Sequence, residues 1–251
     1  MNYKKEESYW LQDIGKKELV LGVLSGLGLI LIVAYLFYGS IWPAIFLSPY
    51  LIVHMKTWKQ KQIQKAKQAF QLQFAEAIQA LSASLQVGYS SENALKEAFV
   101  DLQLIYPKDT RILKELHYML RQLEMNLSME QIFQEFGKRT KDPDVELFAT
   151  VFALSKRAGG DMVEVIRNAV WQIGEKLEVK REIELMVAAK KLEFRIMSMV
   201  PLGMMFYIKV AFSSFLDVLY GNVMGVFFMS ICLAFYAGAY EWGRRMVEIE
   251  V

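Results

Sequence analysis

Few side chains in this sequence have the types and the spacing that catalysis or metal binding requires. The chain has two histidines, His54 and His117, and one cysteine, Cys232, so it contains neither an H-x-x-x-H nor a C-x-x-C motif. A single cysteine also excludes a disulfide framework within one chain. His54 lies at the end of an apolar run, His117 lies beside an apolar helical stripe, and Cys232 lies within an apolar run. Such positions are ordinary for residues with a structural role. We therefore expect no metal site, no cofactor and no enzymatic activity.

One glycine pair has a composition that is compatible with phosphate binding. Gly159-Gly160 is followed by Asp161, but it lies between two predicted helices and does not follow a strand, so it is not a dinucleotide-binding loop. Gly137-Lys138 lacks the upstream glycine of a P-loop. We interpret Gly159-Gly160 as a structural turn.

A cluster of lysines directly after an apolar run is the strongest candidate for anion binding. Its members are Lys56, Lys59, Lys61, Lys65 and Lys67. Nucleic acid and anionic lipid are both possible ligands for such a cluster. Because the cluster adjoins an apolar run, we expect it to face membrane lipid and not nucleic acid. Attraction to anionic lipid contributes about 1 kcal/mol per lysine.

Lys209 is the one ionisable residue well inside a predicted membrane span. A charge near the bilayer midplane would indicate a transport path. Lys209 follows Arg195 by about 20 Å of helix, however, so we expect its ammonium group to extend to the outer interface.

The elements that must position these side chains fall into apolar runs and a charged middle region. The 251 residues have a mean hydropathy of +0.22, yet 22% of them are charged. Residues 19–53 and 218–240 contain no Asp, Glu, Lys, Arg or His. This segregation is typical of a membrane protein with a substantial soluble part.

We predict four membrane-spanning helices, and we expect Pro201 to kink the third of them. The four runs are residues 19–38, 41–55, 196–216 and 218–240. The second run is only about 22 Å long as a helix and contains two prolines, so it either spans or re-enters; we favour spanning.

Basic residues predict the orientation of these helices. The lysine cluster follows the second run, Arg244 and Arg245 follow the fourth, and the two short loops carry no Lys or Arg. By the positive-inside rule, both termini and the charged middle region are cytoplasmic. The predicted division is an N-terminal segment (1–18), a membrane hairpin (19–55), a helical domain (56–195), a second membrane hairpin (196–240) and a tail (241–251).

In the middle region, apolar residues recur at helical spacing in six stripes, which predicts an all-α protein with a cytoplasmic six-helix bundle. The sixth helix has no clear stop signal between Asp161 and the third membrane run. We expect it to be long and to connect the bundle mechanically to the membrane. Its candidate coupling residues are Lys176, Lys180, Arg181, Lys190 and Lys191.

One short turn occurs three times in the middle region, each time with a residue that tolerates positive φ, a spacer and a helix N-cap. The copies are Gly88-Tyr89-Ser90, Asn126-Leu127-Ser128 and Gly159-Gly160-Asp161. Asn93, Gln131 and Glu164 follow at the position that completes a capping box. In addition, residues 74–102 resemble residues 145–173 at an offset of 71, which predicts two similar helical hairpins.

These three turns, followed by a charged helix and a proline-containing apolar run, resemble the type II secretion F domain over about residues 66–251. The stretches that carry the resemblance are FAEAIQALSASLQVGYSSENALKEAF and LRQLEMNLSMEQIFQEFGKRTKDPDVELFATVFALSKRAGGDMVEVIRNAV. Asn126 stands where the family usually has glycine, and asparagine also accepts the left-handed conformation. The single domain copy and the closing RRMVEIEV resemble the TadB/TadC branch of the Tad (Flp) pilus assembly platform proteins.

The resemblance implies a multi-pass platform protein of the bacterial cytoplasmic (inner) membrane. Such a protein is not an enzyme; it couples a cytoplasmic hexameric secretion ATPase to the assembly of pilin subunits. The implied partners are that ATPase, a second platform protein or further copies of this chain, pilin subunits and membrane lipid. The alternative is a small membrane transporter or channel subunit with a regulatory cytoplasmic helical domain.

Overall fold

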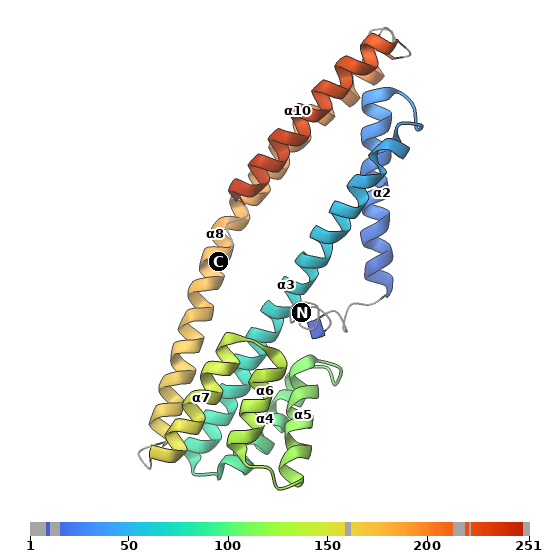
Figure 1. Ribbon diagram of the computed structural model, residues 1–251. Helices are drawn as coiled ribbons and strands as arrows, with labels where there is room; N and C mark the ends of the chain where they lie inside the picture. Colours follow the sequence, from blue (N-terminus) through green and yellow to red (C-terminus); the bar gives the residue numbers. More distant parts are fainter. Residues whose placement is uncertain (1–8, 11–15, 159–161, 213–218, 221, 248–251) are drawn as a thin grey trace. The chain divides into compact units, whose positions relative to one another are not determined.

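The computed structural model describes residues 9–10, 16–158, 162–212, 219–220 and 222–247, and these are helical with short connections (Figure 1). No strand occurs in these ranges. The longer helices are α2 (Lys16–Tyr38), α3 (Ala44–Val87), α4 (Ser91–Ile105), α5 (Arg111–Glu124), α6 (Met129–Thr140), α7 (Pro143–Ala158), α8 (Met162–Ala211) and α10 (Val223–Val247).

The chain forms two compact units, and α3 and α8 each contribute residues to both. The bundle unit comprises Met1–Asp13 and Gln62–Val179. The hairpin unit comprises Ile14–Lys61 and Lys180–Val251. The bundle unit is narrower than the predicted domain at residues 56–195, and it also includes the start of the chain.

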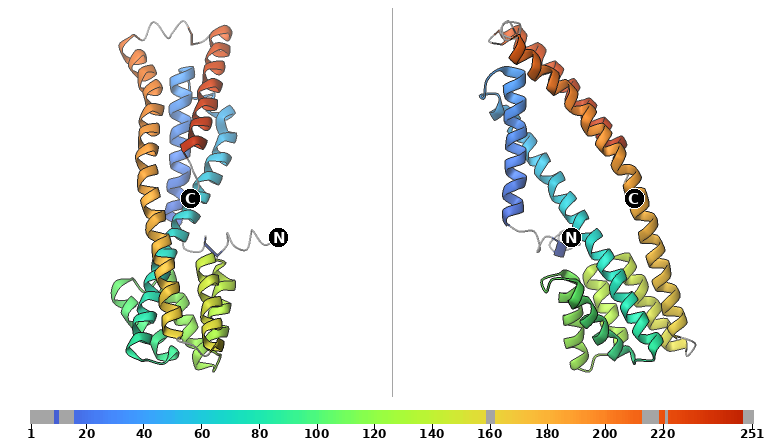
Figure 2. Two further views of the ribbon diagram at one scale, coloured as in Figure 1. Left: turned by 90° about the vertical axis from the view of Figure 1, so that its left-hand side faces the viewer. Right: turned by 180° about the vertical axis from the view of Figure 1, so that it is seen from behind.

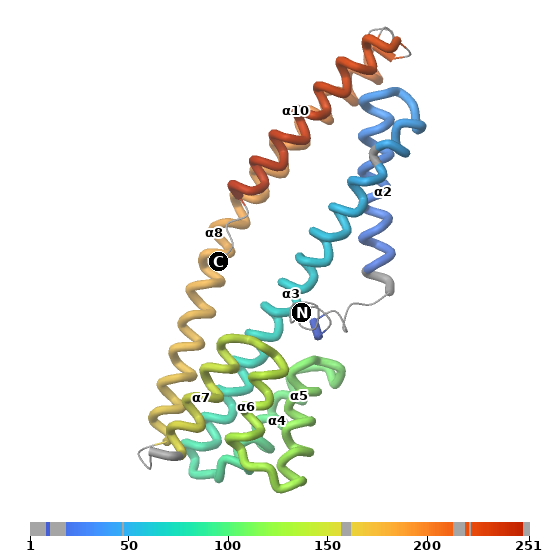
Figure 3. Tube along the Cα trace, viewed as in Figure 1, coloured from blue at the N-terminus to red at the C-terminus, as the bar shows by residue number. Residues whose placement is uncertain are grey.

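Six helices surround the core of the bundle unit, as the six apolar stripes predict: the C-terminal part of α3, α4 to α7 and the N-terminal part of α8 (Figure 3). Aromatic rings from three helices meet at its centre. The Phe74 ring lies 5.9 Å from both the Phe136 and the Phe148 rings, and Phe133 lies 4.7 Å from Phe152, all measured between centroids. Burial of such large side chains is the main stabilising term for a bundle of this size.

Burial repeats along the chain at the offset of 71 that the sequence indicates. On α3 the buried positions include Phe74, Ala77, Ile78, Leu81 and Ser82, and on α7 they include Val145, Phe148, Ala149, Phe152 and Ala153. On α4 they include Leu95, Ala98 and Leu102, and on α8 they are Ile166, Ala169 and Ile173. Three pairs depart from the pattern: Leu85 and Ala94 are buried whereas Lys156 and Val165 are exposed, and Ser155 is buried whereas Ser84 is half-buried. The hairpins α3–α4 and α7–α8 thus present equivalent faces to one core.

The first two of the three turns have the expected geometry. Gly88 has a φ of +101°, and Ser90 Oγ accepts the Asn93 N–H at 3.3 Å. Asn126 has a φ of +61°, and Ser128 forms both halves of a capping box with Gln131. The third turn, with Gly159, Gly160 and Asp161, lies outside the described residues.

The sequence explains only part of the connection between α6 and α7. Asp142 Oδ1 accepts the Asp144 N–H at 3.0 Å and so caps α7, whose first residue is Pro143. This matches the preference for an acidic N-cap followed by proline. Lys141, by contrast, ends α6 in the left-handed conformation with a φ of +51°, which no glycine or asparagine announces.

Among the residues that the structure describes, three helices are long and apolar enough to cross a membrane: α2 from Leu19 to Tyr38, α8 and α10. The predicted run at residues 41–55 is not a separate helix, because α3 begins at Ala44 and continues through Pro49 to Val87. α10 begins later than predicted and extends to Val247, so Arg244 and Arg245 lie in its last turn.

Two close contacts define how helices pack within the hairpin unit. Trp58 and His54 of α3 lie against Gly22 and Gly26 of α2, where an added Cβ would be 2.9 Å from each ring. The left view of Figure 2 shows α8 and α10 standing apart, and Phe194 of α8 reaches α10, where a Cβ on Gly243 would overlap the Phe194 ring. Glycine is thus the residue that allows these rings to approach a helix backbone.

α8 continues without interruption through Pro201. Proline lacks the N–H that would bond to Met197 and crowds the preceding turn. One residue further on, Tyr236 Oη of α10 donates to the Ser198 carbonyl at 2.7 Å. α10 therefore supplies a hydrogen-bond donor to a backbone carbonyl in the turn before Pro201. The kink expected at Pro201 stays a prediction.

Candidate functional site

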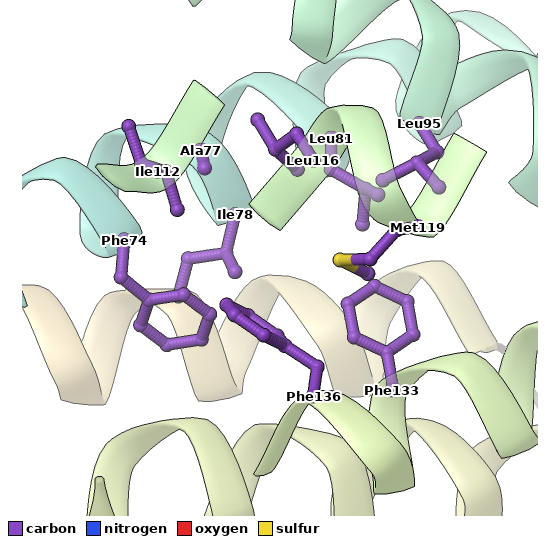
Figure 4. A pocket seen from close by; sticks show the side chains of 10 residues that line it. All are labelled: Phe74, Ala77, Ile78, Leu81, Leu95, Ile112, Leu116, Met119, Phe133 and Phe136. Carbon is purple, nitrogen blue, oxygen red and sulfur yellow. The ribbon is translucent and has the colours of Figure 1, made fainter. Parts of the chain in front are cut away.

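A cavity in the core of the bundle unit is too small for a small-molecule ligand. That cavity has a volume of about 10 Å³, and ten apolar side chains line it (Figure 4). They are Phe74, Ala77, Ile78, Leu81, Leu95, Ile112, Leu116, Met119, Phe133 and Phe136. A water molecule needs about this volume and also polar partners, which these side chains do not provide. The cavity is a packing gap and not a binding site.

A metal site is also not apparent in the described part of the chain, where no three His, Cys, Asp or Glu side chains are grouped to hold an ion. The candidate functional features are therefore those that connect helices. Two such features involve charged or aromatic side chains of the bundle unit.

The first feature is a buried acidic pair at the start of α7. Asp142 Oδ2 accepts a hydrogen bond from Gln71 Nε2 of α3 at 3.0 Å. Asp144 forms an ion pair with Lys176 of α8, with 2.5 Å between Oδ1 and Nζ. α7 is thereby joined to α3 on one side and to α8 on the other.

The Asp144–Lys176 pair is asymmetric in its exposure to water. The Asp144 side chain is 4% exposed, whereas that of Lys176 is 56% exposed. Among the described atoms, Asp144 Oδ2 is buried and has no hydrogen-bond partner. A buried carboxylate is costly without its counter-ion, so this contact specifies where α8 lies against α7.

The structure separates Lys176 from the other predicted coupling residues of α8. Lys176 lies in the bundle unit, whereas Lys180, Arg181, Lys190 and Lys191 belong to the hairpin unit. Lys190 pairs with Glu193 at 3.0 Å on an exposed surface, a contact worth about 0–1 kcal/mol. Arg181 and Lys191 are exposed as well. Lys176 holds α8 to α7 by an ion pair with a buried acid.

The lysine cluster on α3 faces outward for most of its length. Lys56, Lys59, Lys61 and Lys65 are exposed. Lys67 is half-buried, and its Nζ lies 5.8 Å from the centroid of the Trp10 ring.

The second feature is an aromatic pair near the start of the chain that the sequence analysis does not identify. The Trp10 side chain is 1% exposed and lies in the bundle core, 5.3 Å from the Phe70 ring. Tyr9 Oη donates to Glu115 Oε1 at 2.7 Å, and the Arg111 guanidinium lies 4.2 Å from the centroid of the Tyr9 ring. Two adjacent large aromatics in a charged segment were the available signal.

Glu115 is the polar centre of this contact. Arg139 donates to its Oε2 from Nε at 3.2 Å and from Nη2 at 2.9 Å. Burial, followed by the charge of Glu115, raises the pKa of Tyr9, so the phenol stays protonated and donates at neutral pH. Tyr9 and Trp10 are thus held against α3 and α5, and Arg139 of α6 pairs with the same Glu115.

Comparisons with family models, curated proteins and solved structures found no match for this chain. Its function is therefore argued from its residues and their arrangement.

Proposed function

We propose that this chain is an inner-membrane platform protein of a type II secretion or type IV-like (Tad/Flp) pilus assembly machine. In this role the bundle unit receives the motion of a cytoplasmic secretion ATPase, and the hairpin unit passes it to pilin subunits in the membrane. The resemblance of the turns to the type II secretion F domain supports the proposal, and so does the repeated hairpin in the bundle. The role requires no catalytic residue in this chain.

The observation that carries the proposal is the continuity of α8. Its first turns are buried in the bundle at Ile166, Ala169 and Ile173, and its last part is apolar enough to cross a membrane. Its 50 residues correspond to about 75 Å of unbroken helix. Because a continuous helix is stiff along its axis, a displacement of the bundle end moves the membrane end.

The contact between Trp10 and Phe70 supports the proposed topology by an argument independent of charge. Two residues in one core lie on the same side of a membrane, so the chain between them crosses it an even number of times. α2 supplies one crossing. The N-terminal part of α3, from Ala44 to about residue 61, then supplies the second. With α8 and α10, the proposed count is four spans, and the positive-inside rule, not this contact, assigns the bundle and both termini to the cytoplasm.

Co-purification and flux measurements together test this function. The full-length protein, purified from its own membranes in mild detergent, should bring down a hexameric ATPase. The same protein alone in liposomes should conduct no solute or ion above empty liposomes. Specific flux without an associated ATPase would instead support the transporter or channel alternative and contradict the platform.

A further inference from the structure

The C-terminus of α2 is a point where backbone carbonyls need donors from elsewhere. α2 ends at Tyr38, and the last four carbonyls of any helix lack their usual i+4 amide partners. Gly39, with a φ of +64°, returns one amide to the Tyr35 carbonyl at 3.1 Å. The carbonyls also carry the negative end of the helix dipole, which favours a nearby cation.

Two side chains from the second half of the hairpin unit donate to these carbonyls. Lys209 Nζ of α8 donates to the Tyr35 carbonyl at 2.5 Å. Tyr220 Oη donates to the Leu36 carbonyl, also at 2.5 Å. The end of α2 is therefore capped by residues that follow it by more than 170 positions.

The Lys209 ammonium is also held by aromatic rings. Its Nζ lies 3.4 Å from the centroid of the Tyr35 ring and 5.0 Å from that of the Tyr220 ring. Both distances are within the range of cation–π attraction, which strengthens as water is excluded. Carbonyls and rings at the end of α2 thus compensate the charge of Lys209, and its expected extension to the outer interface stays a prediction.

Buried apolar side chains lie next to this contact, which is itself open to water, since Tyr35 is 50% exposed. Leu36 and Phe37 of α2 are buried against Met229 of α10. The hydroxyls of Tyr38 and Ser230 lie 2.9 Å apart, and a Cβ on Gly39 would be 2.9 Å from the Tyr220 ring. Gly39 is thus required both by its positive φ and by the ring that covers it.

We propose that Lys209 is a positioning residue that locks the end of α8 to the C-terminus of α2, so that both membrane hairpins move together when α8 moves. The lock between α8 and α2 is a property of the molecule alone. The joint movement of the two hairpins rests on the proposed function, in which α8 carries motion from the bundle.

Crosslinking with a short bis-maleimide tests the lock in the full-length protein in detergent. Tyr38→Cys and Ser230→Cys, in a Cys232→Ser background, place one thiol on α2 and one on α10, where the Tyr38 and Ser230 hydroxyls lie 2.9 Å apart. The reagent spans the length that is lost when the tyrosine side chain is replaced by the shorter cysteine. Adding Lys209→Met should reduce the crosslink yield several-fold, because the cation that caps α2 is lost. Lys209→Arg retains the charge and should retain most of the crosslink. An unchanged yield with Lys209→Met would overturn the lock.

A second variant covers the case in which Lys209→Met does not fold. Tyr220→Phe retains the ring and removes the single hydroxyl that donates to Leu36. It should lower the yield by less than Lys209→Met, and an unchanged yield would count against the capping arrangement.

Pilus assembly in the bacterial host tests the coupling half separately. Lys209→Met should abolish assembly and Lys209→Arg should retain it. A variant that loses the crosslink yet assembles normally would overturn the coupling. If the wild-type chain supports no pilus assembly, the platform function fails, while the crosslink result still decides the lock.

Discussion

The bundle unit and the hairpin unit bury their apolar side chains in different ways. In the bundle unit every helix contributes buried residues to one core. In the hairpin unit the buried apolar side chains described are few, and α2, α8 and α10 leave large apolar residues exposed along their length. The bundle supplies its own apolar environment, as a water-soluble domain does, whereas the hairpin unit requires lipid or another apolar partner.

The polar contacts of the two units differ in the same sense. The bundle unit uses ion pairs between side chains, such as Asp144–Lys176 and Glu115–Arg139. Between the helices of the hairpin unit, Lys209, Tyr220 and Tyr236 donate to backbone carbonyls, while ion pairs such as Lys190–Glu193 lie within one helix. In an apolar medium an unsatisfied carbonyl is costly, so donors are directed to the backbone at a helix end and beside a proline.

The largest expected effect comes from emptying the bundle core. Phe74→Ala should lower the free energy of unfolding by about 3–5 kcal/mol, because a buried ring is lost and leaves a cavity. Phe235→Ala, at a position of α10 that is 76% exposed, is the matched change in the hairpin unit and should cost far less. Denaturant unfolding of the full-length protein in one detergent measures both. Equal losses would contradict the assignment of separate cores.

Overpacking between α2 and α3 is the next largest effect. Gly26→Val places methyl groups against the His54 ring and should destabilise the hairpin unit by about 1–3 kcal/mol. Gly28→Val is the control in the same helix, since nothing lies within 4 Å of its added Cβ. Thermal unfolding followed by circular dichroism compares the two variants. Similar melting temperatures would show that α2 and α3 do not pack through Gly26.

Removing the counter-ion of Asp144 should have an effect toward the lower end of the same range, because water reaches Lys176. Lys176→Met is expected to cost about 1–3 kcal/mol, since it leaves a buried carboxylate without its partner. Lys190→Met, which breaks only an exposed pair, should change the free energy of unfolding by about 0–1 kcal/mol. Chemical denaturation distinguishes them, and a Lys176→Met variant as stable as Lys190→Met would contradict the role of the buried pair.

The smallest effect concerns an alkaline titration in the bundle unit. Burial, and then the 2.7 Å hydrogen bond from Tyr106 to Glu76, raise the pKa of Tyr106 from its usual value near 10 to about 12. A raised pKa stabilises the fold fully below about pH 10, and this contribution is lost as the pH rises to about 12. The stability difference between wild type and Tyr106→Phe should therefore shrink over that range. A constant difference would contradict the shift.

Much of the bundle can be predicted from the sequence because its signals are local. Helical periodicity finds the buried faces, and Gly88, Asn126 and Asp142 mark turns through their own backbone and capping chemistry. The absence of a stop signal after Asp161 correctly predicts that α8 is one long helix.

What the sequence leaves out depends on contacts between distant residues. Trp10 joins Phe70 across 60 positions, and Lys209 joins Tyr35 across 174. Neither pair has a periodic or local pattern, so both require the tertiary fold. The continuity of α3 through Pro49 was also not predicted. The helix continues because a proline in the first turns of a helix interrupts it less than a proline in the middle.

The most direct test of the account is whether α8 must be unbroken between the bundle and the membrane. Glu184→Pro removes a backbone donor and destabilises the helix locally by about 3 kcal/mol or more, while Glu184→Ala retains the helix. The account predicts that both variants insert into the membrane and retain a folded bundle, but that only Glu184→Ala supports pilus assembly. Normal assembly by a folded, inserted Glu184→Pro variant would contradict it.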